Sequence, residues 1–219
     1  MTTEKSLTDT RALRKVASSA GVVAGIGGME HGFLEMLQGN VVTSGRVIES
    51  IGAAQRFWVH GSEPAFTLVP NFLVTGIMAV TVSLMVIIWS TAFINRKYGA
   101  LVLLCLSIIM FLVGGGFAPP VFAIVAVLAA TLMNMQFRWL RTHIPEKLIY
   151  FLAKLWAITL IPFIVLSVAE IITAIFGYPL LWFFHEDSIT DVLMTFGNVT
   201  FFGLGPIVLI TSLAHDIKK

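Results

Sequence analysis

The chain has 219 residues, of which 57% are hydrophobic (Ala, Val, Ile, Leu, Met, Phe, Trp, Tyr or Cys) and only 12% are charged. A water-soluble globule has about twice that charged fraction and could not bury so much apolar surface, and the same numbers exclude a disordered chain. Cys105 is the one cysteine, which excludes a disulfide scaffold, and a net charge of +2 gives no sign of nucleic-acid binding. The composition therefore predicts an integral membrane protein whose main partner is the lipid bilayer.

Several apolar stretches follow one another along the chain. A helix needs about 20 apolar residues to cross the hydrocarbon core of a membrane. We predict six spans, at residues 16–37, 67–94, 100–113, 121–137, 148–176 and 192–214. The runs are continuous, which favours helices over the alternating segments of a membrane β-barrel. The predicted fold is therefore all-α, a single domain built as a bundle of six transmembrane helices.

Lysine and arginine gather on one face of this predicted bundle. Twelve of the 14 basic residues lie near the termini, in the connections after the second and fourth spans, or early in the fifth span. Only Arg46 and Arg56, in the connection after the first span, lie on the other face. Because cytoplasmic connections carry the excess of basic residues, this pattern predicts that both termini are cytoplasmic. The face opposite the termini is then the outer face.

The first outer connection, residues 38–66, is the longest. Val47, Ile51, Ala54 and Trp58 are spaced by four, three and four residues. This spacing predicts a helix over residues 45–58 that lies along the outer membrane surface. Such a helix either covers the end of the bundle or forms a lid over a cavity.

The third and fourth spans form a short hairpin around residues 114–120, with the sequence Gly-Gly-Gly-Phe-Ala-Pro-Pro. The two arms, of 14 and 17 residues, would be about 21 and 25 Å long, which is less than a full crossing. We expect residues 114–120 to be non-helical and to turn below the outer surface, beside other helices or a wet pocket, where irregular backbone is tolerated. A tight turn at a thinned membrane edge is the alternative.

Polar residues within the spans concentrate in the outer half of the bundle. They are Glu30, His31 and Glu35 in the first span, Asn71 in the second, Glu170 in the fifth and Asn198 in the sixth. Ionisable groups at membrane depth are costly, so each marks a candidate ligand or proton pocket.

The first span orients part of this set. His31 and Glu35 are four residues apart and share a helix face, beside a stripe of small residues that includes Gly25 and Gly32. We therefore expect this pair to face the bundle and to converge with Glu170. Glu30 lies about 100° around the helix from His31 and is expected to meet a different neighbour.

This arrangement is compatible with three kinds of chemistry. His31 and Glu35 could ligate one metal ion, completed by His60 and Glu63 from the outer connection, or relay a proton, or form a structural polar network. No catalytic residue and no cofactor is assigned. The leading hypothesis is binding or passage of a small cation, proton or polar solute. The alternatives are a non-catalytic scaffold subunit of a larger membrane complex or homo-oligomer, and an intramembrane metal-dependent enzyme.

A set of short motifs accompanies these features: Glu30-His31-Gly32-Phe33-Leu34-Glu35, Gln38-Gly39-Asn40, Gly61-Ser62-Glu63-Pro64, Pro70-Asn71 and the Gly-Gly-Gly-Phe-Ala-Pro-Pro turn at 114–120. Together they resemble an uncharacterised family of small bacterial polytopic membrane proteins, over roughly residues 20–215. The resemblance implies six helices and a bacterial cell (inner) membrane. It implies no activity.

Overall fold

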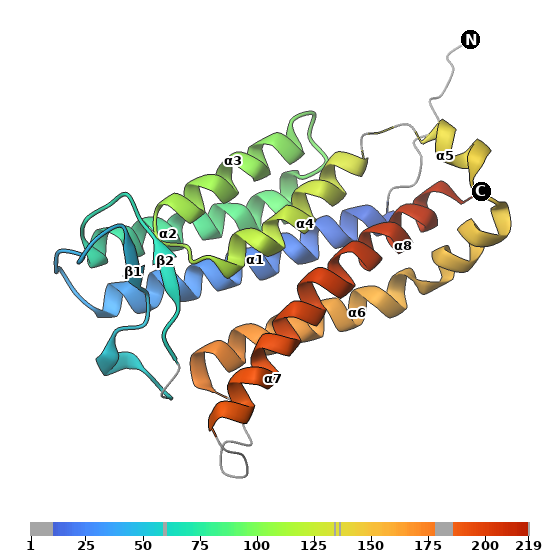
Figure 1. The fold of residues 1–219 in the computed structure, drawn as a ribbon. Coiled ribbons are helices and arrows are strands. Elements are labelled where there is room, and N and C mark those ends of the chain that lie inside the picture. Colours follow the sequence, from blue (N-terminus) through green and yellow to red (C-terminus); the bar gives the residue numbers. More distant parts are fainter. Residues whose placement is uncertain (1–10, 59–60, 134, 136, 178–185, 219) are drawn as a thin grey trace.

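The computed structural model describes residues 11–58, 61–133, 135, 137–177 and 186–218, and these are mainly helical (Figure 1). The α-helices are α1 (Arg11–Leu37), α2 (Phe72–Ile88), α3 (Gly99–Leu112), α4 (Ala118–Met133), α5 (Arg138–His143), α6 (Glu146–Phe176), α7 (Glu186–Asn198) and α8 (Gly205–Ile217). Two π-helical segments, Trp89–Phe93 and Val199–Leu204, continue α2 and join α7 to α8. The all-α prediction is confirmed for the body of the molecule.

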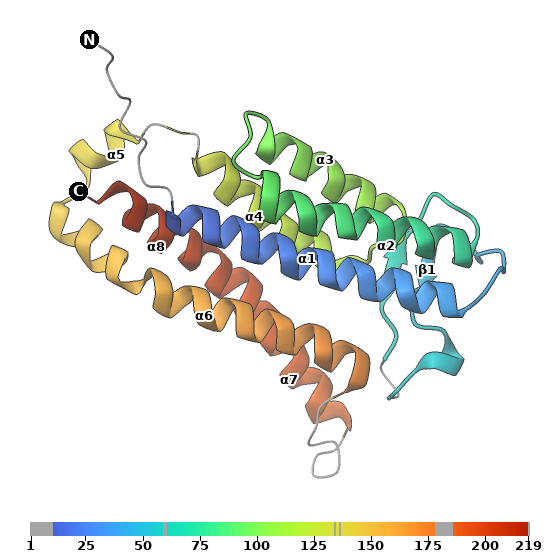
Figure 2. The same cartoon turned by 180° about the vertical axis from the view of Figure 1, so that it is seen from behind.

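The helices form two groups that meet along α1 and α4. Helices α1 to α4 lie side by side, and α6 packs against α8 (Figures 1 and 2). The predicted small-residue stripe on α1 allows its close approach to α2. A Cβ added to Gly76 would lie only 2.4 Å from the carbonyl oxygen of Gly32. Buried side chains that include Phe122 of α4 and Phe163 of α6 join the two groups.

Three helical segments within the described residues are long and apolar enough to cross a membrane: Phe72–Phe93, Glu146–Phe176 and Thr195–Ile217. Helices α3 and α4 are apolar but shorter, with 14 and 16 residues. These segments are in keeping with a membrane-embedded protein. The six-span topology and the cytoplasmic placement of the termini remain predictions.

Helix α2 begins five residues later than the predicted second span. Asn71 is its N-cap and accepts a hydrogen bond from the backbone N–H of Val74 at 3.1 Å, while Pro70 precedes it. A residue before the cap does not adopt helical geometry. Thr67 is extended instead and forms an isolated β-bridge with Val113.

The helix predicted over residues 45–58 is wrong. The segment contains strand β1 (Val47–Glu49), which pairs antiparallel with β2 (Pro64–Phe66), and a single 3-10 turn (Ala53–Gln55). Ile48 is buried whereas its two neighbours in β1 are exposed, so the local hydrophobic period is two and not that of a helix. We call the end of the molecule that carries β1 and β2 the strand end.

The glycine turn between α3 and α4 confirms one part of its prediction and corrects another. Residues 114–117 are non-helical, and Gly114 and Gly116 have φ of 98° and 77°. Residues 118–120 are helical, against the prediction, because the first turn of a helix needs no intrahelical N–H and therefore accepts proline. The three glycines of the turn are buried beside the end of β2, where the N–H of Gly114 donates to the carbonyl of Phe66 at 3.0 Å.

Candidate functional site

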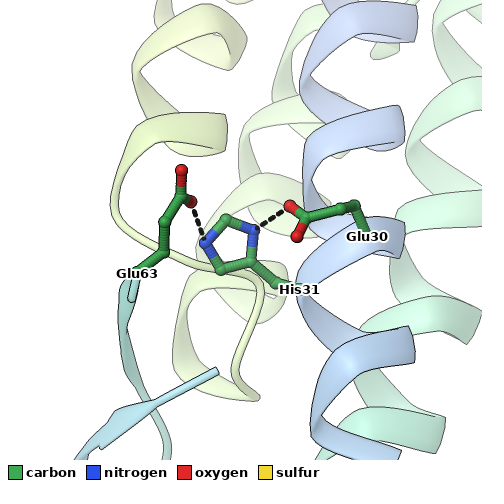
Figure 3. A group of neighbouring side chains, drawn as sticks. All are labelled: Glu30, His31 and Glu63. Atoms are coloured by element: carbon green, nitrogen blue, oxygen red, sulfur yellow. Dashed lines mark ion pairs between the residues drawn. The ribbon is translucent and has the colours of Figure 1, made fainter. Parts of the chain in front are cut away.

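His31, in the last third of α1, is the centre of a polar cluster at the strand end, and its side chain is 2% exposed. Its Nδ1 lies 2.9 Å from the carbonyl oxygen of Gly27 and 3.0 Å from Oε2 of Glu30 (Figure 3). The expectation that Glu30 meets a different neighbour is therefore wrong. The Glu30 side chain is long enough to reach the imidazole of the adjacent residue. Two acceptors at Nδ1 mean that this nitrogen carries a proton.

Glu63, in the loop just before β2, approaches the other side of the same ring. Its Oε2 is 2.7 Å from Nε2 of His31, a distance typical of a charge-assisted contact between an imidazole nitrogen and a carboxylate. Burial alone would raise the pKa of Glu63, but the hydrogen bond from His31 and the positive charge of its ring outweigh this effect and lower the pKa from its ordinary value of 4.5. Glu63 was one of the candidate ligands expected from the outer connection.

Glu35 lies one turn after His31 and is completely buried. Its Oε1 accepts a hydrogen bond from the hydroxyl of Ser50 at 3.0 Å, and its Oε2 has no hydrogen-bond partner. The expectation that His31 and Glu35 both turn inward is confirmed by their burial. Ser50 was not singled out by the sequence, because a single serine in a loop carries no recognisable pattern.

The glycine turn packs directly on these two side chains. A Cβ added to Gly116 would lie 2.3 Å from Nε2 of His31, and one added to Gly114 would lie 2.4 Å from Oε2 of Glu35. Both residues also have positive φ, which L side chains rarely adopt. The turn therefore needs glycine for two reasons, backbone conformation and clearance for the cluster. The sequence predicted the turn but not its contact with His31 and Glu35.

Glu170 belongs to α6. Its Oε1 faces Gly197 of α7, where an added Cβ would lie 2.6 Å away, and its Oε2 is buried without a hydrogen-bond partner. Its negative charge is repelled by that of Glu63. The convergence of Glu170 with His31 and Glu35 in one shared pocket stays a prediction.

The remaining candidates have other positions. Asn71 caps α2 and donates to Oδ1 of Asn40 at 2.7 Å, so its hydrogen bonds serve the local fold. Asn198 ends α7 and is exposed. His60 lies outside the described residues.

The loop that carries Glu63 also contacts α6. The indole N–H of Trp58 donates to the carbonyl of Ala174 at 3.0 Å, and the rings of Phe57 and Phe176 are 4.9 Å apart. The loop thus extends from the strands to the second helix group and brings one acidic side chain to His31.

Glu30, His31 and Glu63 could together hold a metal ion. Each offers one ligand atom, and the three atoms lie within 4.8 Å of one another. Carboxylate oxygen and imidazole nitrogen are ordinary ligands of divalent transition metals.

Comparisons of the chain with models of known protein families, with curated proteins and with solved structures give no match. The resemblance to a bacterial membrane protein family stays a prediction, and the functional argument rests on the geometry of the cluster.

Proposed function

We propose that this protein binds a small cation, a proton or a metal ion, in the cluster of Glu30, His31 and Glu63 at the strand end. The observation that supports the proposal most strongly is the 2.7 Å separation between Nε2 of His31 and Oε2 of Glu63. Nδ1 already carries a proton, so a neutral ring would present the lone pair of Nε2 to a carboxylate. Two acceptors at this distance repel each other unless a positive charge lies between them.

The charge balance of the surroundings also favours a cation. The carboxylates of Glu30 and Glu63 contact opposite sides of one imidazole ring, and Glu35 lies one turn farther along α1. Among the described residues, no lysine or arginine forms an ion pair with any of these three carboxylates. Buried carboxylates are stable only when they are paired, neutralised or bound to a cation.

The proposal can be tested by thermal unfolding of the purified protein in detergent. A ligand that binds only the folded state raises the melting temperature as its concentration increases. Na⁺, K⁺, Mg²⁺, Ca²⁺, Zn²⁺ and protons would be titrated separately. We expect at least one of them to stabilise the wild type and to have no such effect on Glu63→Gln.

Glu49→Gln is the matched control, because it removes the same charge from the same connection between α1 and α2, at an exposed position at the end of β1 that pairs with Arg56. It should respond to the cation as the wild type does. If no cation stabilises the wild type, or if Glu63→Gln responds equally, the proposed function is wrong. The second result would favour a scaffold subunit, which should tolerate changes in this cluster.

We further propose six spans with both termini on the cytoplasmic side of a bacterial inner membrane. The support is the distribution of basic residues, together with hydrogen bonds that hold the start of α1 beside the end of α8. In a Cys105→Ala background, cysteine at the exposed positions Val42 and Lys97 should react from opposite sides of the membrane. Labelling of both from the same side of intact cells would overturn this topology.

A further inference from the structure

We propose that the cation is a divalent first-row transition metal of the Zn²⁺ class, bound by Nε2 of His31 and Oε2 of Glu63, with Glu30 as the residue that orients the imidazole. This inference rests on the proposed function and names the ligand atoms and the class of metal. It goes beyond the expected pairing of His31 with Glu35, since the metal ligands come from α1 and from the loop before β2.

The tautomer of His31 suits metal binding. Nδ1 faces two acceptors, the carbonyl of Gly27 and the carboxylate of Glu30, so its proton is fixed and the lone pair remains on Nε2. Metal-bound histidines almost always donate their other N–H to a carboxylate or a backbone carbonyl. In this protein both kinds of acceptor are present at the same nitrogen.

The contact between His31 and Glu63 brings together two atoms that can bind one cation. Nε2 and Oε2 are 2.7 Å apart, a distance typical of an imidazolium that donates to a carboxylate. A metal about 2.0–2.2 Å from each atom would replace this proton, and the two ligands would then move slightly apart. The zinc titration and the absorption spectrum distinguish the metal from the proton.

Unpaired buried atoms around the contact provide an independent observation. Oε1 of Glu30 and Oε2 of Glu35 are buried without hydrogen-bond partners. The carboxylates of Glu30 and Glu35 are hydrogen-bond acceptors when ionised. They would accept hydrogen bonds from the water molecules that complete the coordination sphere of the metal. Such unpaired buried groups are rare in a purely structural network.

The ligand types select the class of metal. Imidazole and carboxylate suit zinc and its first-row neighbours, whereas Ca²⁺ and Mg²⁺ prefer oxygen ligands alone. The sole cysteine, Cys105, is an exposed residue of α3, and Met36 packs against Gly76 of α2. The three side chains of the cluster offer only nitrogen and oxygen ligands, which do not suit a soft ion such as Cu(I).

The test uses the full chain in detergent, freed of metal with a chelator and then titrated with Zn²⁺ alone. Isothermal titration should show one site per chain. X-ray absorption at the zinc edge should show only nitrogen and oxygen ligands, with the multiple-scattering signal of imidazole. His31→Gln and Glu63→Gln should each lower the affinity at least 100-fold, and Glu30→Gln by about 10–100-fold, as expected for an orienting residue.

Two matched controls separate this site from adventitious binding. Glu49→Gln removes an exposed carboxylate at the end of β1, and His143→Gln removes an exposed histidine on α5. Both should bind Zn²⁺ as the wild type does. If a cluster variant fails to fold, as judged by circular dichroism and gel filtration, the absorption spectrum of the wild type still decides the ligand set.

The inference is overturned if the wild type binds no Zn²⁺, if the spectrum lacks imidazole, or if His31→Gln retains the affinity. If Na⁺, K⁺ or protons nevertheless stabilise the wild type and not Glu63→Gln, the proposed cation site stands and only its metal assignment fails. If no cation has this effect, both proposals fail.

Discussion

Buried carboxylates lie at both ends of α1, and the two ends differ in how these groups are paired. At the start of the helix, Asp216 of α8 accepts hydrogen bonds from the N–H groups of Ala12 and Leu13 at 3.0 and 2.9 Å. Its Oδ1 is also 3.2 Å from Nδ1 of His215. Near the end of the helix, Glu30 and Glu35 each retain a buried oxygen without a hydrogen-bond partner.

This difference separates a carboxylate that stabilises the fold from carboxylates available for binding. Asp216 satisfies two of the free N–H groups that every helix has at its N-terminus, and its negative charge complements the helix dipole. Glu30 and Glu35 contribute no comparable cap. The unpaired oxygens cost stability, and such a cost is tolerable where an ion or water supplies the missing partner.

The largest expected effect on stability comes from the glycine turn that covers the binding end. Gly116→Ala should lower the free energy of unfolding by about 3 kcal/mol, because it combines a strained positive φ with a Cβ 2.3 Å from Nε2 of His31. It should also abolish cation binding, since either His31 or the turn must move. Chemical denaturation and the cation titration measure the two effects.

Gly39→Ala is the control for backbone strain. Gly39 also has a positive φ, of 85°, but an added Cβ would meet nothing within 4 Å. We expect a loss of about 1 kcal/mol and unchanged cation binding. Equal losses of unfolding free energy in the two variants would show that the close contact between Gly116 and His31 adds nothing to the cost of backbone strain.

A direct test of the comparison replaces one carboxylate at each end of α1 by its amide. Asp216→Asn should cost about 2 kcal/mol, since one oxygen that accepts a backbone N–H becomes an NH₂ group. Glu35→Gln should change stability by less than about 1 kcal/mol, because Oε1 can still accept from Ser50 and Oε2 has no partner to lose. A larger loss for Glu35→Gln than for Asp216→Asn would place Glu35 among the structural groups.

The smallest expected effect is a loss of stability at acidic pH, through the protonation of Glu63. The pKa of Glu63 is lower in the folded protein than its ordinary value of 4.5, so the ionised side chain stabilises the fold above that pH. This contribution should disappear as the pH falls through the lower folded value. Unfolding between pH 7 and pH 3 should therefore reveal a stability difference between wild type and Glu63→Gln that narrows in acid. A constant difference would argue against an ionic contact with His31.

The sequence predicted the main helices well, because continuous apolar runs bounded by proline, glycine or charged residues leave few alternatives. It failed in the first outer connection, where Val47, Ile51, Ala54 and Trp58 fit a helical spacing by coincidence. The antiparallel pairing of β1 with β2 depends on residues 15 to 19 positions apart, such as Ile48 and Ala65, and a local pattern does not contain such a contact. Tertiary pairing thus outweighed local periodicity.

The candidate site was predicted in part for similar reasons. Charged residues in an apolar helix are conspicuous, so His31 and Glu35 could be identified from the sequence. Their spacing of four residues also predicted that both side chains face the interior of the bundle. The residues that contact His31 could not be predicted in this way, because they depend on the length of a side chain and on the path of a loop. Glu30 reaches the ring from the adjacent position, Glu63 arrives from a loop, and Gly116 covers Nε2. None of these three contacts follows from a helical wheel.

An anomalous difference map at the zinc edge, from crystals of the full chain grown with Zn²⁺, tests the central claim most directly. The account predicts one peak within bonding distance of Nε2 of His31 and Oε2 of Glu63, with the Nδ1 side of the ring still facing Glu30. The peak should be absent from Glu63→Gln crystals. A map with no peak at this cluster, or with zinc only at surface histidines such as His143, would contradict the account.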